Sequence, residues 1–286
     1  MSGATGRLGG LVCEILAQKV PREDIRALGR NEEKLAKLAQ RGFTTAVADF
    51  ADPESLERAY SGVQRLLLIS ATGPVDARIG LHKNAFAAAQ KSGVDQLLYT
   101  SRVNPSDDSL YSFSPIHAEA ERDIAAMSIP ATVVRNSEYI ENTLPAVFEA
   151  VETGHLVMPG KKGRVAHISV DEIGEILAKI LLSDGHEGRI YELNGPLAVH
   201  REEVAALIED IARRPVRAIP NTATEFAAIR RRQGRAEFLV RMAESLFRTI
   251  DAGEFETVYP DAEHLLGRRP VSMLDVVRTQ LSRSAT

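Results

Sequence analysis

The sequence predicts an α/β fold built on a doubly wound parallel sheet, and three observations lead to that prediction. First, 286 residues, of which 44% are hydrophobic and 26% charged, are enough to bury a substantial core. Second, short apolar runs alternate with amphipathic stretches through the first half of the chain. Third, these runs are too far apart for hairpins, so crossover helices must connect parallel strands. Such sheets bind ligands at the carboxyl ends of their strands.

Five apolar runs in the first half are expected to be buried strands. They cover residues 25–28, 43–48, 64–70, 96–101 and 131–135. Between them, apolar residues recur with helical spacing over residues 8–18, 32–40, 53–60, 76–91 and 115–127. This β-α order is typical of a sheet covered by helices on both faces.

The second half of the chain is expected to form a smaller, mainly helical lobe. Helical patterns cover residues 144–152, 170–182, 201–213, 224–251 and 273–282, with extended pieces at 164–168 and 189–193. The sequence therefore predicts a nucleotide-binding domain over residues 1–143 and a substrate lobe over residues 144–286. The segments around 164–193 are expected to pack on the sheet or to join it.

Composition excludes several classes of protein. No apolar run approaches the ~20 residues of a membrane span, and no apolar segment follows Met1, so a soluble protein without a secretory signal and without membrane contact is expected. One cysteine, Cys13, cannot form an internal disulfide, which favours a reducing cytoplasm; on an apolar helix face it is expected to be packed and inert. A net charge of -4 with interspersed signs makes nucleic acid an improbable direct partner.

A glycine-rich run near the amino end points to a dinucleotide. Gly3, Gly6 and Gly9 form a G-x-x-G-x-x-G pattern that leads into an apolar helical stretch. Glycines let the backbone approach a pyrophosphate closely, and the start of the next helix offers free N–H groups. A strand ends about 20 residues later, where dinucleotide folds contact the ribose. There Arg30 offers a planar fork to a 2'-phosphate, which predicts NADP(H) over NAD(H); the alternative is an ordinary solvated charge at a helix start.

Seven segments in this order and spacing carry a family resemblance: GATGRLGG, ALGRNEEK, VADFADPESL, LLLISAT, LLYTS, VVRNSEYIEN and YELNGP. Together they resemble the NmrA-like atypical short-chain dehydrogenases, most of all the subgroup of type 2 NAD(P)H:quinone oxidoreductases and triphenylmethane reductase. The resemblance covers nearly the whole chain. It implies a Rossmann domain, a preference for NADPH and a small C-terminal substrate lobe.

The resemblance also implies functional positions, residue by residue. Positions that match the cofactor contacts are Gly3, Thr5, Gly6, Arg7 and Leu8 for the pyrophosphate, Arg30 for the adenosine phosphate, Asp49 and Phe50 beside adenine, and Ile69, Ser70, Thr100 and Ser101 beside the nicotinamide ribose. Tyr139 and Asn142 match positions near the nicotinamide and the substrate. For the residues at strand ends, the alternative is simple termination of a strand by a polar side chain.

The beginning of the chain departs from the family. A strand of about five residues normally precedes the first glycine and occupies the middle of the sheet. Here only Met1 and Ser2 precede it. Either Met1 lies downstream of the true start, or the strand is shortened and the sheet is compromised; we favour the first.

The Tyr-x-x-x-Lys pair of typical short-chain dehydrogenases is missing. The residues four positions after the six tyrosines are Gln64, Val103, Pro115, Thr143, Gly195 and Glu263. Without a lysine to lower the pKa of a tyrosine, reduction of a plain ketone by that route is not expected. One explanation is hydride transfer to a quinone-like acceptor, where positioning supplies most of the rate. The other is a non-catalytic redox sensor that acts through a protein partner.

For the enzyme, Tyr139 is expected to line or hydrogen-bond the acceptor, with Ser101, Asn142 and His117 as further catalytic candidates. His117 could donate a proton near neutral pH. The alternative for it is a polar residue in the first turn of a helix capped by Ser114 with Pro115 at its first position.

No metal site is expected, because His117 and Glu121 have no further ligands that the sequence announces. A run of three arginines at 230–232 is interpreted as a solvated helix face, more readily than as an anion site. The apolar spacing over residues 226–250 fits core packing or a partner surface. A homodimer is left open.

Overall fold

The computed structural model describes residues 1–71 and 73–284, which divide into two compact units. The first unit comprises residues 1–102, 116–135 and 171–191, and the second comprises residues 103–115, 136–170 and 192–286. The chain therefore passes between the units several times. The division into domains at residue 143 stays a prediction. Within the described ranges, no helix is long and apolar enough to cross a membrane.

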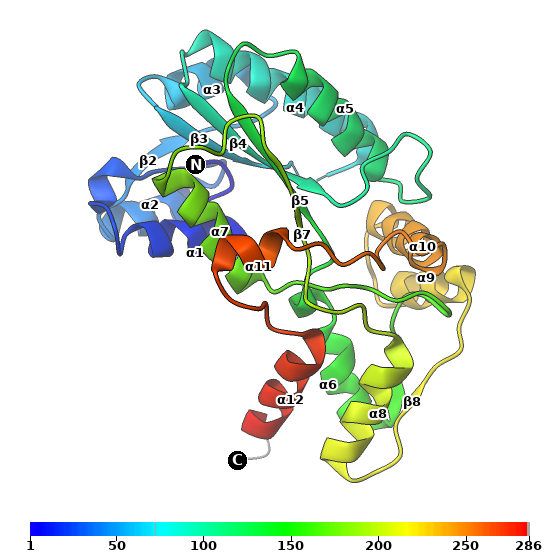
Figure 1. Ribbon diagram of the computed structural model, residues 1–286. Coiled ribbons are helices and arrows are strands. Elements are labelled where there is room, and N and C mark those ends of the chain that lie inside the picture. Colours follow the sequence, from blue (N-terminus) through cyan, green and yellow to red (C-terminus); the bar gives the residue numbers. More distant parts are fainter. Residues whose placement is uncertain (72, 285–286) are drawn as a thin grey trace. The chain divides into compact units, whose positions relative to one another are not determined.

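The first unit contains the parallel sheet that the sequence predicts (Figure 1). Its strands are β1 (Arg26–Gly29), β2 (Thr44–Val47), β3 (Arg65–Ile69), β4 (Gln96–Arg102), β5 (Ala131–Asn136) and β7 (Ile190–Leu193). β1 pairs with β2 in parallel, and a second sheet has the order β3-β4-β5-β7. β3 and β4 are also parallel, with Arg65 opposite Gln96. β7 thus joins the sheet, although it comes late in the chain. This agrees with one of the two alternatives expected for residues 164–193, which were to pack on the sheet or to join it.

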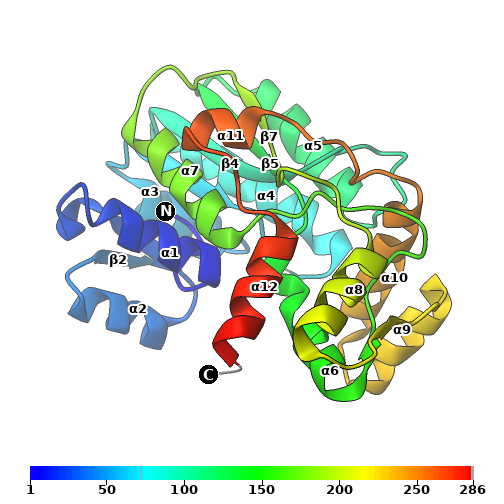
Figure 2. The same cartoon turned by 60° about the horizontal axis from the view of Figure 1, so that its bottom comes forward.

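Helices cover both faces of this sheet. They are α1 (Arg7–Leu16), α2 (Glu32–Gln40), α3 (Pro53–Tyr60), α4 (Val75–Lys91), α5 (Ser114–Ala125) and α7 (Val170–Leu182), with a short 3-10 turn η1 (Arg22–Asp24). Figure 1 shows α3, α4 and α5 on one face and α1 and α7 on the other. Gly174 of α7 permits a close approach to α1, because a Cβ there would lie 2.7 Å from Leu11 Cδ2. In Figure 2 the same two helices lie side by side.

Met1 and Ser2 lie between β1 and β3. Leu28 donates its N–H to the Met1 carbonyl oxygen at 2.9 Å, and Ser2 donates its N–H to the Leu67 carbonyl oxygen at 2.8 Å. Ile69 donates its N–H to the Ser2 hydroxyl oxygen at 2.9 Å. These two residues therefore supply hydrogen bonds to both neighbouring strands, although the ladder is too short to merge them into one sheet.

The core of the first unit lies between the sheet and the helices α3 to α5. Leu66 and Leu68 of β3, Tyr99 of β4 and Ala85 and Phe86 of α4 are all buried there. Burial of such apolar side chains contributes about 1.5–3 kcal/mol each, which makes this layer a stable support for the strand ends.

The second unit is mainly helical. Its helices are η2 (Ile140–Asn142), α6 (Leu144–Thr153), α8 (Arg201–Ala212), α9 (Ala223–Arg232), α10 (Glu237–Asp251), α11 (Asp261–Leu266) and α12 (Met273–Ser284). Two short strands, β6 (His155–Leu156) and β8 (Arg217–Ala218), pair in parallel. Val147, Val204, Ile208 and Val277 belong to its buried core. The extended piece at 164–168 forms isolated bridges, one of them between Val165 and Val199.

One helix prediction in this unit was wrong. The pattern over residues 224–251 suggests one helix, but the structure has two, α9 and α10, which lie side by side (Figures 1 and 2). Gly234 lies between them with φ +71°, a left-handed conformation that ends a helix. Phe226 and Phe247 pack across the pair with ring centroids 5.8 Å apart. The apolar spacing therefore serves packing within the unit at these two positions.

Candidate functional site

The glycine-rich loop is compact because its glycines touch its own backbone. Gly3 has φ +65°, which an L side chain rarely adopts. A Cβ on Gly9 would lie only 2.2 Å from the Gly3 carbonyl oxygen. The loop also donates the Gly6 N–H to that same oxygen at 2.9 Å. The first and third glycines are thus required by the shape of the turn, as the motif predicts.

The loop ends at the start of α1, where no side chain forms a capping hydrogen bond. Gly6 is the N-cap with φ -91° and ψ 176°, and the first turn holds no acidic residue. Gly6 and Arg7 are exposed, whereas Leu8 is buried and anchors the helix to the core. Uncapped N–H groups and the positive end of the helix dipole together form a site for an anion. The loop and the helix start therefore fit the pyrophosphate of a dinucleotide.

The end of β1 lies against this loop. A Cβ on Gly29 would lie 3.0 Å from Thr5 Cγ2, so Thr5 occupies the space beside the strand end. The next residue, Arg30, is exposed and forms no ion pair with any carboxylate in the described ranges. Asn31 then caps α2 by accepting the Lys34 N–H at 2.8 Å. The guanidinium of Arg30 is thus available to an anion beside the loop.

The ends of β2 and β3 add two further walls in the same unit. The Asp49 carboxylate accepts the Ala51 N–H at 3.0 Å, and the Phe50 carbonyl oxygen accepts an amide hydrogen from Asn84 at 2.9 Å. Ile69, at the end of β3, contacts the glycine loop, because a Cβ on Gly3 would lie 3.4 Å from Ile69 Cβ. The structure therefore brings the loop and the end of β3 together.

Two side chains hold the turn after β3. Ser70 donates its N–H to the Thr100 hydroxyl oxygen at 3.0 Å, and Ala71 donates its N–H to His82 Nε2 at 3.0 Å. A ring nitrogen that accepts a hydrogen bond carries no proton, so His82 must be the neutral tautomer with its hydrogen on Nδ1. The sequence pattern indicates Thr100 but not His82, because a histidine on a long helix carries no signal that it will reach a strand end.

His82 belongs to a buried aromatic cluster behind this turn. Its ring lies 5.6 Å from that of Tyr99 and 6.3 Å from that of His117, and the Tyr99 hydroxyl lies 3.1 Å from His117 Nδ1. Burial, reinforced by the positive charge of Arg78, lowers the pKa of His82 to about 3. Burial likewise lowers the pKa of His117 well below its usual value and raises that of Tyr99. Both histidines are neutral at physiological pH.

Ser101 is also engaged in a network. Its hydroxyl donates to Glu121 Oε1 at 2.6 Å, and Glu121 pairs with Arg135 through Nε at 3.0 Å and Nη2 at 2.6 Å. All three residues belong to the first unit. Because Ser101 is only 5% exposed, this network fixes the end of β4.

Tyr139 and Asn142 belong to the second unit. Asn136 donates an amide hydrogen to the Tyr139 hydroxyl oxygen at 3.3 Å. Burial raises the pKa of Tyr139 to about 12, so the phenol keeps its proton at neutral pH. Asn142 ends η2 and is exposed at the wall of a cavity described below.

Ser114 begins α5, and its hydroxyl bonds to the preceding loop. It accepts the Ser106 N–H at 2.9 Å and donates to the Asn104 carbonyl oxygen at 3.1 Å. Cys13 is fully buried, and burial raises the pKa of its thiol to about 11. No group of three or more His, Cys, Asp or Glu in residues 1–71 and 73–284 could hold a metal ion.

A model of the NmrA-like family matches residues 1–260. The chain belongs to the NmrA-like family. Quinone oxidoreductase 2 of Escherichia coli is 36% identical to it over 206 residues, which are 72% of this chain and 71% of that protein. The NAD(P)H azoreductase of Xenophilus azovorans is 28% identical over 221 residues, 77% of this chain and 76% of that protein.

Solved structures of NmrA-like reductases superpose closely on this chain. Triphenylmethane reductase of Citrobacter sp. has a TM-score of 0.91 at 29% identity, and 98% of each chain is covered. The NADPH-dependent quinone oxidoreductase of Escherichia coli, solved in complex with NADPH, has a TM-score of 0.91 at 30% identity with the same coverage. The predicted fold class and family are thus confirmed.

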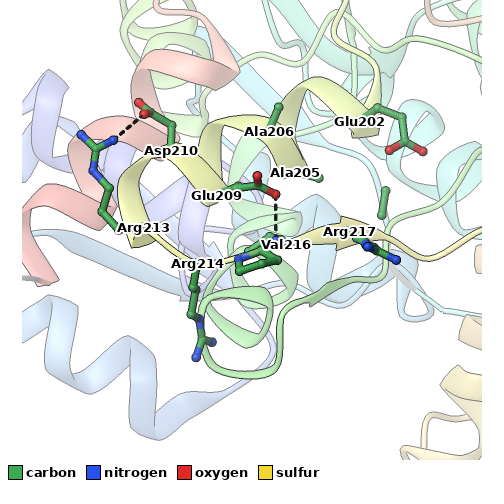
Figure 3. A pocket seen from close by; sticks show the side chains of 11 residues that line it. Glu202, Ala205, Ala206, Glu209, Asp210, Arg213, Arg214, Val216 and Arg217 are labelled. Atoms are coloured by element: carbon green, nitrogen blue, oxygen red, sulfur yellow. Dashed lines mark hydrogen bonds and ion pairs between the residues drawn. The ribbon is translucent and has the colours of Figure 1, made fainter.

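The second unit of this NmrA-like chain contains several cavities. One, of about 770 Å³, lies where α8 ends and β8 begins (Figure 3). In its wall, Arg213 pairs with Asp210 at 3.0 Å and Glu209 accepts the Val216 N–H at 3.1 Å. Another, of about 360 Å³, is lined by parts of α6, α9 and α10, and Asn142 is among its residues.

Proposed function

We propose that this chain is an NAD(P)H-dependent oxidoreductase that transfers hydride to a quinone or a similar conjugated electrophile, without a Tyr-Lys pair. The observation that carries the proposal is the glycine loop, in which Gly3 and Gly9 are in backbone contact and the uncapped start of α1 follows. The names of the relatives support it, since one is a quinone oxidoreductase and another an NAD(P)H azoreductase.

When bound, the nicotinamide supplies the hydride. The first unit then binds and orients it. Gly3, Thr5, Gly6 and Arg7 would face the pyrophosphate, and the ends of β3 and β4 would form the wall beside the nicotinamide ribose. His82 and Thr100 hold the turn at that wall through its N–H groups. A fixed position of the nicotinamide increases the rate of hydride transfer, because it keeps the donor close to the acceptor.

NADP(H) is proposed over NAD(H) because of Arg30. Its exposed guanidinium can form paired, charge-assisted hydrogen bonds with a 2'-phosphate. The first turn of α2 carries Glu32 and Glu33, which would repel that phosphate. Discrimination between the two cofactors therefore rests on Arg30, and its removal is a direct test.

Tyr139 is proposed to hydrogen-bond the acceptor. Its pKa of about 12 leaves the phenol protonated, so it can donate to an oxygen that gains negative charge. His117 is neutral and buried, and the hydrogen bond to Tyr99 gives it a supporting role in the wall of the first unit. Ser101 supports the end of β4 in the same way. An acceptor whose charge spreads over a conjugated ring needs no stronger acid.

The test is oxidation of NADPH by a panel of quinones, followed at the absorbance of the reduced nicotinamide. Saturable oxidation with at least one quinone is expected. If calorimetry shows NADPH binding but no quinone is reduced, the sensor alternative replaces the enzyme. If neither dinucleotide binds to the folded chain, the proposal is refuted. A cytoplasmic location and a homodimer remain predictions.

A further inference from the structure

The cavity formed by α6, α9 and α10 in the second unit combines apolar walls with unpaired positive charge. Ile229, Leu239 and Met242 lie among its lining residues, and all three are partly buried. An apolar lining with a few polar groups is the usual character of a small-molecule site, and about 360 Å³ lies within the usual range of volumes.

Two arginines line this cavity without a carboxylate partner. Arg230 is partly buried, and its Nη1 donates to Gln233 Oε1 at 3.0 Å. Arg235 is exposed at the same cavity. Neither arginine forms an ion pair with any carboxylate in residues 1–71 or 73–284. The one acidic residue in the lining, Glu149, is therefore not within ion-pair distance of either guanidinium.

The guanidinium of Arg230 is held in place by its surroundings. It lies 4.7 Å from the ring centroid of Phe226, a geometry of cation–π attraction, and Phe226 is 2% exposed. Burial and the nearby charge of Arg235 lower the pKa of Arg230 from its usual value, and the carboxylate of Glu149 only partly offsets this shift. An anion placed between the two arginines would stabilise their charged forms, because each guanidinium would then have an opposite charge beside it.

The neighbouring arginines of the same run are arranged differently. Arg231 is exposed and pairs with Glu237 at 2.8 Å, while Arg232 is exposed and outside the cavity. The structure thus separates one cavity-lining residue from two solvated ones, a distinction that the sequence pattern alone does not give.

We infer that this cavity binds a planar apolar molecule that carries one carboxylate or sulfonate, with the anion at Arg230 and Arg235 and the ring against Leu239 and Met242. As a statement about the hydride acceptor, this rests on the proposed function; Asn142, which the family resemblance places near the substrate, is part of the lining. The preferred acceptors are then quinones or azo compounds with an acidic substituent, and Arg230 sets that preference.

The first test compares two acceptors that differ by one anionic group, 1,2-naphthoquinone and 1,2-naphthoquinone-4-sulfonate, in NADPH oxidation. Arg230→Gln should raise KM for the sulfonate about tenfold or more, because a charge-assisted hydrogen bond is lost. KM for the neutral quinone should change less than about twofold. Arg235→Gln should act in the same direction with a smaller effect. Arg232→Gln, the matched control on the same helix, should leave both KM values unchanged.

The second test needs no turnover. Calorimetric titration of the full chain compares naphthalene-2-sulfonate with its neutral analogue, naphthalene-2-sulfonamide. The sulfonate should bind about tenfold more tightly, and the Arg230→Gln/Arg235→Gln double variant should lose that advantage while it still binds the sulfonamide, which reports an intact cavity.

The outcomes separate the two proposals. Suppose that quinones are reduced, but that Arg230→Gln changes the KM of the sulfonate no more than Arg232→Gln does. The inference is then overturned and the proposed function stands. If no acceptor is reduced but the sulfonate binds through the two arginines, the reductase proposal fails and the anion site stands. Equal binding of sulfonate and sulfonamide by the wild-type chain refutes the site whatever the activity.

Discussion

A single methyl group at Gly9 tests the geometry of the cofactor loop. In Gly9→Ala the new Cβ would lie 2.2 Å from the Gly3 carbonyl oxygen, 2.6 Å from the Gly3 carbonyl carbon and 2.9 Å from the Ala4 Cα atom. All three are backbone atoms, so no side-chain rotation can relieve the contact. Carbon atoms pack best at about 3.5–4.0 Å, so the loop and α1 must separate by about 1 Å.

The expected cost follows from two opposing effects. Overpacking of this kind costs about 1–3 kcal/mol, and contacts this short belong at the upper end of that range. Alanine in a helix regains about 0.8–1.0 kcal/mol relative to glycine. The free energy of unfolding should therefore fall by about 2 kcal/mol, which lowers the Tm by about 4–8 °C for a chain of this size. Movement of the α1 start should also weaken NADPH binding about tenfold or more.

The matched control is Gly10→Ala, one residue further along α1. There the nearest atom to a new Cβ is the Ala4 carbonyl oxygen at 3.3 Å, which needs to yield by only a few tenths of an ångström. Its free energy of unfolding should stay the same or rise by up to about 1 kcal/mol. Thermal unfolding and calorimetric titration with NADPH measure both effects. Equal Tm values and equal NADPH affinities for the two variants would refute the argument from loop packing.

Four further predictions follow from the same structure. Arg30→Ala should weaken NADPH binding more than NADH binding; equal losses by calorimetry would remove Arg30 from the 2'-phosphate. Tyr139→Phe should lower turnover and leave the Kd of NADPH unchanged, and unaltered turnover would make the phenol structural. His82→Leu should weaken NADPH binding about tenfold, whereas His82→Gln, whose amide oxygen can accept the Ala71 N–H, should recover most of it; the same loss in both would exclude this positioning role. Burial lowers the pKa of His82 to about 3, that of His167 to about 4 and that of His117 well below its usual value, so the unfolded chain binds more protons than the folded chain below pH ~6.5 and stability falls as pH drops. Urea unfolding at pH 7.5 and pH 5 should show a loss of about 2 kcal/mol per histidine, and His82→Gln should show one such contribution fewer.

Local sequence patterns predicted a helix or strand correctly where its ends depend only on residues within that element. The strand predicted at residues 96–101 appears as Gln96–Arg102, and the helix predicted at 32–40 appears as Glu32–Gln40. The pattern over residues 224–251 failed because the left-handed Gly234 interrupts an apolar spacing that continues on both sides. The periodicity of apolar residues indicates which face of a helix is buried. It does not reveal a single residue at which the chain reverses direction.

In the candidate site, too, some features could be predicted from the sequence and others could not. The compact glycine loop could be predicted because a pyrophosphate needs backbone N–H groups at short spacing. The role of Arg30 at a 2'-phosphate stays a prediction. The role of His82 could not be predicted, because its bond to Ala71 joins a helix to a strand end.

The sequence by itself determined the alternation of strands and helices in the first half of the chain, the glycine-rich turn at the amino end and the absence of a Tyr-Lys pair, since each depends on residues close together in the chain. Only the tertiary structure decided that β7 completes the sheet from the other half of the chain and that Arg230 lines a cavity while Arg231 and Arg232 do not. The reason is that burial and pairing depend on contacts between distant segments, and identical side chains in one run can differ only through what the fold places beside them.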